Sequence, residues 1–206
     1  MTNKIWLSSP HMGGKEQEYV QQAFDGNWIA PIGPNLNEFE REICNYTGAK
    51  YSVGLTSGTA AIHLALKILG VGTGDFVLVQ SFTFCGSANP VIYSGATPVF
   101  IDSERLTWNM CPKALSVSLE DIDKKGLIDK VKAIIPVHLY GMPAKMDQIS
   151  SIASNYGIPI VEDAAESIGS SIRNEQTGTF GEIGVYSFNG NKIITTSGGG
   201  DRKSVV

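Results

Sequence analysis

The sequence predicts an α/β fold with a mostly parallel sheet flanked by helices. Apolar runs of strand length alternate with segments of helical periodicity along all 206 residues, and no internal repeat or linker interrupts them. The run at 76–80 begins with four successive apolar residues, as in a parallel strand buried on both faces. Successive predicted strands lie ~20–30 residues apart, which is typical of βαβ units with right-handed crossovers.

The hydrophobic pattern places each element along the chain. Helical spacing predicts helices over 14–26, 35–48, 58–70, 88–93, 119–131 and 146–157. Strands are predicted over 51–57, 76–80, 97–102, 132–141, 158–163 and 184–188. The helix over 58–70 is apolar on most sides, so we expect it to be buried.

Composition and charge argue against several classes of protein. The 16 basic and 20 acidic residues give a net charge of −4, without the basic run of a nucleic-acid binder. No apolar stretch reaches the ~18 residues of a membrane span, and the first residues do not resemble a signal peptide. The three cysteines lack metal-ligand spacing, and such a sparse, odd set is typical of a reduced compartment. We therefore expect a cytoplasmic protein without a metal site.

Five polar clusters follow predicted strands. They lie at 56–59, 81–84, 138–141, 162–166 and 187–192. In an open parallel sheet, ligands bind beyond the carboxyl ends of the strands, and those ends share one edge. We therefore expect one ligand site at this edge.

The cluster at Ser57, Gly58 and Thr59 allows two interpretations. It stands where a helix begins, and the free N–H groups and positive dipole end of a helix favour a phosphate. Gly58 would let the backbone come close, and Thr59 would add a hydroxyl. The same residues also suit a simple N-cap worth ~1 kcal/mol, which the motif alone favours. The sequence matches neither the P-loop nor the dinucleotide fingerprint.

Three further side chains also allow two interpretations, of which the structural one is favoured when each residue is taken alone. Asp163 suits a helix cap, but Glu162 and Glu166 lie beside it, and so much charge suggests a cationic partner. Phe84 suits either core packing or stacking on a planar ligand. Lys192 suits a solvated surface charge or, among small and apolar neighbours, a desolvated amine with a lowered pKa that forms Schiff bases.

Together these clusters match the needs of one cofactor. A phosphate cradle, a stacking ring, a carboxylate and an amine are the groups that hold pyridoxal 5′-phosphate. The amine forms an imine with the cofactor, and the carboxylate keeps the pyridine nitrogen protonated so that the ring accepts electrons. The order of the groups and their placement at strand ends predict this cofactor more strongly than any single group.

Longer motifs point to a family. The chain resembles the pyridoxal-phosphate-dependent sugar aminotransferases of the DegT/DnrJ/EryC1/StrS family over residues 5–200, in the segments LTSGTAAIHLAL, SFTFCGSANPVIYSGATPVFID, PVHLYGMPAKMD, VEDAAESIGS and GTFGEIGVYSFNGNKIITTSGGG. The resemblance implies the fold type I architecture of these transferases. Residues 1–200 would then form the large cofactor-binding domain, incomplete because the small C-terminal domain is missing.

The resemblance also implies a role for each site residue. Lys192 matches the family's catalytic Schiff-base lysine, and Asp163 matches the partner of the pyridine nitrogen. The family's dehydrases carry a histidine in place of this lysine, so Lys192 implies transamination.

The other cofactor contacts are carried over in the same way. Gly58, Thr59 and Ser187 match the residues that bind the phosphate. Phe84 matches the residue that stacks on the ring. Glu166 takes a position that is often Gln in the family, beside the cofactor's 3-hydroxyl.

Substrate choice is implied by a narrower similarity. The segments at 7–24 and 27–40 look like enzymes that aminate C4 of a UDP-linked 4-keto-6-deoxy-N-acetylglucosamine, for bacillosamine-type sugars, with glutamate as amino donor. In those enzymes the segment that matches Asn27, Trp28, Ile29 and Ala30 lies against the nucleotide-sugar. A core anchor is the alternative for Trp28, and GDP-perosamine-type synthases share the lysine loop and remain an alternative function.

Family members are longer than this chain and form homodimers, so the resemblance implies site groups from a partner subunit and from later segments. Residues 201–206 match no expected element, and we expect them to be a non-native tail. The sheet would then lack the strand that normally follows the lysine loop. A truncated, non-catalytic fragment that binds pyridoxal phosphate is therefore a second alternative function.

Overall fold

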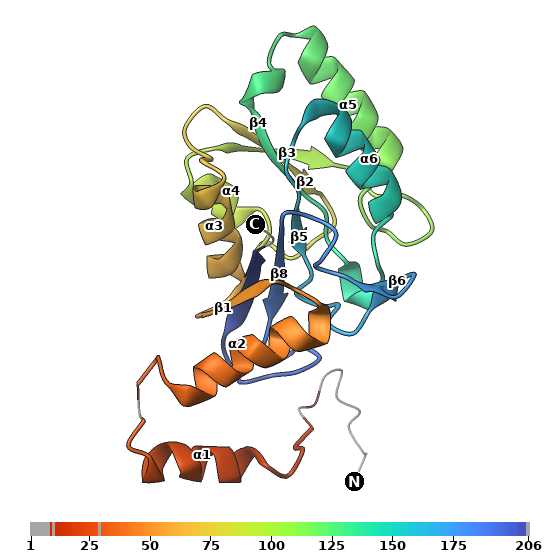
Figure 1. Cartoon of the computed structure of the whole chain (residues 1–206). Coiled ribbons are helices and arrows are strands. Elements are labelled where there is room, and N and C mark those ends of the chain that lie inside the picture. The colour runs from red at the N-terminus through yellow and green to blue at the C-terminus, as the bar shows by residue number, and fades with distance from the viewer. Residues whose placement is uncertain (1–8, 10, 29, 205–206) are drawn as a thin grey trace, which may run out of the picture.

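A central sheet carries helices on both faces (Figure 1). The computed structural model describes residue 9, residues 11–28 and residues 30–204, with 201–204 as backbone only. The helices are α1 (Glu16–Asp25), α2 (Pro34–Thr47), α3 (Gly58–Ile68), α4 (Asn89–Tyr93), α5 (Pro112–Lys124) and α6 (Met146–Tyr156), with short 3-10 turns at Ile128–Lys130 and Leu139–Gly141. The strands are β1 (Tyr51–Leu55), β2 (Phe76–Gln80), β3 (Thr97–Ile101), β4 (Val131–Ile135), β5 (Val161–Asp163), β6 (Ser171–Ile172), β7 (Glu175–Gln176), β8 (Ile183–Ser187) and β9 (Gly200–Ser204).

The strands form two groups that continue into each other. One group has the order β1-β9-β8-β5 and the other β3-β2-β4. Parallel bridges from Ile134 to Ile160 and from Val137 to Asp163 join β4 to β5. Only β9 runs antiparallel to its neighbours in these groups, while the β2–β3, β2–β4 and β5–β8 pairs are parallel. The predicted α/β fold with a mostly parallel sheet is confirmed.

Two apolar layers cover the faces of the sheet. Val77 and Val79 of β2 pack in the cluster that includes α3, whereas Leu78 packs in the cluster that includes α5 and α6. Successive side chains of a strand point to opposite faces, so a continuous apolar run is needed where both faces are covered. The prediction that 76–80 is a strand buried on both sides is confirmed. The expected burial of α3 holds on one side only, because Leu64 and Ile68 are 38% and 54% exposed.

The predicted helix over 119–131 is wrong in its bounds. The helix there is α5, which begins at Pro112 and ends at Lys124. Proline is favoured in the first turn of a helix because its missing N–H has no partner there, and this signal marks the start. Gly126 follows with φ of 68° and turns the chain out of the helix. Leu115 and Leu119 form the buried stripe of α5.

Residues 200–204 form a strand that we did not expect. The backbone of β9 pairs with β1 on one side and with β8 on the other. Main-chain N–H and C=O groups make this pairing, so a slot between two strands accepts a segment whatever its side-chain pattern. The expectation that the sheet lacks a strand after the lysine loop is therefore wrong. That residues 201–206 are non-native stays a prediction.

A short hairpin was also not predicted. Strands β6 and β7 are joined at Arg173 and Asn174, which have φ of 50° and 70°. A two-residue turn with positive φ at both positions is the usual hairpin connection, and Asn is one of the few residues that adopt it readily. The strands have two residues each, too few to show an alternating pattern.

Helix α1 lies apart from the sheet, beyond α2 (Figure 1). None of its residues is buried, and Tyr19, Val20 and Phe24 are more than half exposed. Within the described part of the chain, no helix combines the length and apolar character that crossing a membrane requires.

Candidate active site

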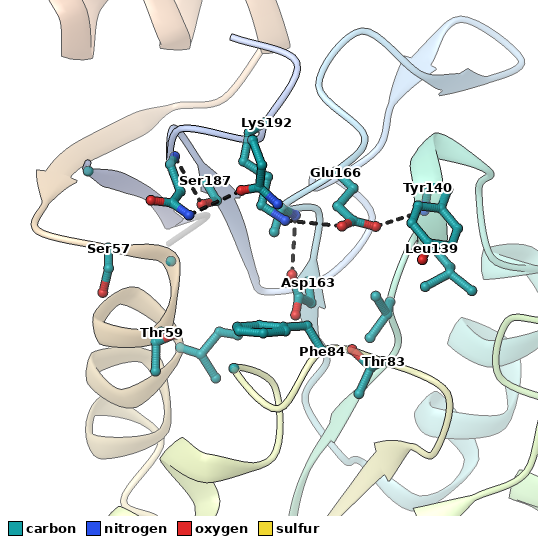
Figure 2. A pocket seen from close by; sticks show the side chains of 18 of the residues that line it. Ser57, Thr59, Thr83, Phe84, Leu139, Tyr140, Asp163, Glu166, Ser187 and Lys192 are labelled. Carbon is teal, nitrogen blue, oxygen red and sulfur yellow. Dashed lines mark hydrogen bonds and ion pairs between the residues drawn. The ribbon is translucent and has the colours of Figure 1, made fainter. Parts of the chain in front are cut away.

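A cavity of about 620 Å³ lies at the edge of the sheet where parallel strands end. Each of the five polar clusters contributes to its lining. All of the residues expected to contact the cofactor line it, namely Gly58, Thr59, Phe84, Asp163, Glu166, Ser187 and Lys192. Figure 2 shows the Phe84 ring beneath Asp163 and Lys192, with the start of α3 at one side. The structure therefore brings together groups that are up to 134 residues apart, from Gly58 to Lys192 (192 − 58).

The start of α3 opens onto this cavity. The Ser57 Oγ accepts a hydrogen bond from the Ala60 N–H at 3.1 Å, so Ser57 is the N-cap of the helix. Gly58 and Thr59 line the cavity beside Ser187. A Cβ atom on Gly58 would lie 3.3 Å from the Ser187 Cβ, which leaves little room for a larger residue. The cap interpretation is right for Ser57, and the helix end remains suited to a phosphate.

The Phe84 side chain is 72% exposed, so the core-packing alternative is wrong. Gly86 makes room for its ring, because a Cβ on Gly86 would lie 3.0 Å from both the Phe84 Cδ1 and the Thr59 Oγ1. The ring lies flat across the floor of the cavity in Figure 2. An exposed aromatic face in a cavity suits stacking on a planar ligand.

Asp163 ends β5 and is buried at 6% exposure, yet it lines the cavity. Its Oδ2 accepts from the Ser87 Oγ at 2.6 Å, and its Oδ1 accepts from the Ala165 N–H at 3.1 Å. Burial raises the pKa of Asp163, while these two hydrogen bonds and the charge of Lys192 oppose the rise. Turns and no α-helix follow Asp163, so the helix-cap alternative is wrong.

Lys192 is mostly buried and has a carboxylate partner. Its side chain is 12% exposed, and its Nζ donates to the Glu166 Oε1 at 3.1 Å. The Glu166 Oε2 accepts from the Tyr140 N–H at 2.9 Å, which fixes the carboxylate from its other side. Tyr140 has φ of 50°, so the loop is bent to present this N–H. The interpretation of Lys192 as a solvated surface charge is wrong.

Glu162 faces away from the cavity, and its role was missed from the sequence. Its buried carboxylate accepts from the N–H groups of Gly178 at 2.8 Å and Gly181 at 2.6 Å, and contacts the His138 Nε2 at 2.9 Å. The His138 Nδ1 accepts from the Ala144 N–H at 3.0 Å, so Nε2 carries the proton and donates to Glu162. Alternation along β5 could have revealed this, since neighbouring strand residues point to opposite faces. The inclusion of Glu162 in a cation-binding acidic patch is wrong.

The expected substrate segment lies outside this cavity. Trp28 and Ala30 line a separate hollow of about 40 Å³, and Ile29 lies outside the described residues. Trp28 is 51% exposed, so it is not a core anchor, and Asn27 has φ of 54°. A Cβ on Gly33 would lie 2.9 Å from the Trp28 ring, so Trp28 holds its own loop. Substrate contact by Asn27, Trp28, Ile29 and Ala30 stays a prediction.

The groups in the cavity fit pyridoxal phosphate. Its volume lies in the range of ~300–1,000 Å³ that small-molecule sites occupy. A helix start suits the phosphate, an exposed aromatic face suits the ring, and a buried carboxylate and a mostly buried amine suit the pyridine nitrogen and the aldehyde. The fold and this set of groups together define a pyridoxal-phosphate type of site.

Comparison with known proteins places the chain in a family. A family model described as the DegT/DnrJ/EryC1/StrS aminotransferase family matches residues 10–201. The chain is 56% identical over 200 residues, which are 97% of this chain and 51% of the relative, to EpsN of Bacillus subtilis (strain 168), named as a pyridoxal phosphate-dependent aminotransferase. It is 42% identical to GDP-perosamine synthase of Escherichia coli O157:H7, over 95% of this chain and 52% of that protein.

A solved structure shows the same architecture. The PLP form of Spr1654 from Streptococcus pneumoniae, named as a sugar aminotransferase, superposes with a TM-score of 0.87 at 29% identity, over 98% of this chain and 53% of that one. The chain belongs to the DegT/DnrJ/EryC1/StrS aminotransferase family, whose members depend on pyridoxal phosphate. The expected family, fold and cofactor are confirmed. The chain spans about half the length of the curated relatives it matches.

Proposed function

We propose that this protein is an aminotransferase that uses pyridoxal phosphate to transfer an amino group to a keto sugar carried on a nucleotide. The observation that carries this proposal is a single cavity lined by Lys192, Asp163 and Phe84 in a chain of this family. When bound, pyridoxal phosphate supplies an electron sink for the negative charge that forms when a substrate carbon loses its proton.

Each residue of the cavity has a separate role in this function. The Lys192 amine holds the cofactor and moves a proton at its Nζ, and Glu166 orients that amine. The Asp163 carboxylate accepts the N–H of the pyridine ring. The exposed Phe84 ring would stack on one face of the pyridine ring and shield that face from water. The α3 start, with Ser187 beside it, binds the phosphate.

The finer substrate assignment is a 4-keto-6-deoxy sugar on UDP, of the bacillosamine type, with glutamate as amino donor. The motifs at 7–24 and 27–40 support this assignment. A GDP-linked sugar, as in perosamine synthesis, is the alternative, supported by 42% identity to a GDP-perosamine synthase. The donor follows from the habit of the family and from no residue of this chain.

Homodimerisation and a cytoplasmic location belong to the same proposal. Helix α1 exposes Tyr19, Val20 and Phe24, and its lack of buried residues suits a helix that packs against a second subunit. The sparse set of three cysteines supports a reduced compartment.

A fragment that binds the cofactor without turnover is a second candidate for the 206-residue chain. The observation that favours it is α1, none of whose residues is buried against the described part of the chain. We expect this chain by itself to aggregate or to bind pyridoxal phosphate weakly. Size-exclusion and cofactor absorbance, compared with the full-length protein, measure this; a cooperative, cofactor-loaded dimer would contradict it.

The experiment that tests the proposed activity uses the full-length protein with pyridoxal phosphate and glutamate. UDP- and GDP-linked 4-keto-6-deoxy sugars and a 3-keto sugar are supplied separately, and mass spectrometry detects the amino sugar. Amination of a UDP-linked 4-keto sugar supports the full assignment. Amination of the GDP-linked or 3-keto sugar alone would refute the assignment to UDP-linked 4-keto sugars, and no amination of any keto sugar would refute the activity.

A further inference from the structure

A chain of hydroxyl groups leads from the cavity to Asp163. The Ser87 Oγ lies 2.6 Å from the Asp163 Oδ2, and the Thr83 Oγ1 lies 2.7 Å from the Ser87 Oγ. Ser87 is fully buried, whereas Thr83 lines the cavity. Both hydroxyls come from the loop between β2 and α4, while Asp163 ends β5. The contact therefore joins two segments that are 76 residues apart.

The direction of these hydrogen bonds follows from what each group can do. An ionised carboxylate only accepts, so the single Ser87 proton is donated to Asp163. The Ser87 oxygen is then left as an acceptor, and Thr83 donates to it. Bonds that run in one direction along such a chain strengthen one another. Because Ala165 holds the other carboxylate oxygen, both oxygens of Asp163 are fixed.

We infer that Ser87, supported by Thr83, is a positioning residue that holds the Asp163 carboxylate as an ionised acceptor facing the cavity. This inference rests on the proposed function, in which Asp163 binds the pyridine N–H. Ser87 does not line the cavity, so it acts through Asp163 and not on the ligand.

The need for such a residue comes from burial. Asp163 has little contact with water, and burial raises its pKa, so some group must favour its charged form. The Ser87 hydrogen bond is the largest influence that lowers the pKa of Asp163, ahead of the Ala165 N–H and the charges of Lys192 and His138. Loss of the hydroxyl should therefore raise the pKa further. Asp163 would then take up a proton, and stop accepting, at a higher pH than in the wild type.

The first test measures the protonation of the Asp163 carboxyl in the full-length protein without cofactor. The ¹³C signal of the Asp163 carboxyl is followed against pH and assigned by its loss in Asp163→Asn. In Ser87→Ala the midpoint of the Asp163 titration should move to higher pH. In Ser87→Thr, which keeps the hydroxyl, this midpoint should stay at the wild-type value. Ser94→Ala is the matched control, because the buried Ser94 hydroxyl donates to the Pro90 carbonyl at 2.9 Å. An unchanged midpoint in Ser87→Ala would overturn the inference.

Thr83→Val covers the case in which Ser87→Ala does not fold. This change removes the donor behind Ser87 at a half-buried position, so the midpoint should move the same way by a smaller amount. A midpoint equal to that of the wild type would overturn the role of Thr83 and of the hydroxyl chain.

The second test measures cofactor binding. Ser87→Ala should bind pyridoxal phosphate about tenfold more weakly, the effect of one hydrogen bond to a charged group. Wild-type affinity in Ser87→Ala would count against the inference. If the wild type itself binds no pyridoxal phosphate, the proposed function fails, and the titration without cofactor still decides whether Ser87 controls Asp163.

Discussion

Lys192 and Glu166 form an ion pair inside the cavity, with the Lys192 Nζ 3.1 Å from the Glu166 Oε1. The other oxygen of Glu166 accepts from the Tyr140 N–H at 2.9 Å. The carboxylate therefore links the loop after β4 to the loop after β8. Since both side chains are partly shielded from water, this pair orients the amine that the proposed function requires.

Glu166→Gln tests whether activity depends on the negative charge of Glu166 or only on its oxygen as a hydrogen-bond acceptor. The amide oxygen can still accept from Tyr140 or from Lys192, so we predict normal cofactor binding and a loss of less than about tenfold in kcat. Glu166→Ala leaves both donors without this partner and should lose more. Steady-state kinetics of the two variants measure the difference. Equal losses in both would show that only the charge is used.

Asp163→Asn should keep the fold and lose most activity, because the amide is nearly isosteric but holds a proton on the pyridine nitrogen poorly. Burial raises the pKa of Asp163 in the folded chain, so the folded state binds more protons than the unfolded state between the two pKa values. Wild-type stability should therefore fall as pH rises through that window, and the variant should lack this fall.

Thermal melts of wild type and Asp163→Asn without cofactor, taken across pH, measure the stability effect, and kcat measures the activity. A variant with nearly normal kcat would show that Asp163 only shapes its turn.

Phe84→Leu should weaken cofactor binding without lowering stability. The ring is 72% exposed, so its removal opens no cavity in the core. The loss of stacking is worth ~0.5–1.5 kcal/mol, which is a few-fold to about tenfold in affinity. Phe100→Leu, at a position 57% exposed on β3, is the control for loss of an exposed ring. Cofactor titration by absorbance decides; equal affinity in both variants contradicts a stacking role.

Glu162→Gln should destabilise the fold. The buried carboxylate accepts from His138, Gly178 and Gly181, and an amide brings N–H groups against these donors. We predict a loss of ~1–3 kcal/mol in the free energy of unfolding. The exposed Glu120→Gln is the control and should change little. Urea unfolding measures both, and an unchanged midpoint for Glu162→Gln would remove its structural role.

Patterns of period and position made much of this molecule predictable. The apolar run at 76–80 predicts a strand covered on both faces, and the rule that ligands bind beyond strand ends predicts which loops line the cavity. The apolar pattern alone does not predict where α5 starts, because the start is marked by Pro112 at the first turn of the helix. β9 was missed because main-chain pairing leaves no side-chain pattern.

Contacts between distant segments were the least predictable part of the site. Ser87 meets Asp163 across 76 residues, and His138 meets Glu162 across 24. The local sequence around each of these residues does not indicate which residue it contacts. Such contacts depend on strand order and register, which set what each loop residue faces.

We propose that Lys192 is the residue that holds pyridoxal phosphate. Lys192→Ala should lose turnover by a factor of at least ~10²–10⁴, because the proton carrier is gone, whereas the exposed Lys67→Ala should not. The most direct measurement is borohydride reduction of the cofactor-loaded protein, followed by digestion and peptide mass mapping. We expect the mass of the reduced cofactor on the peptide that contains Lys192. Label on a different lysine, or no label on a protein that binds the cofactor, would contradict it.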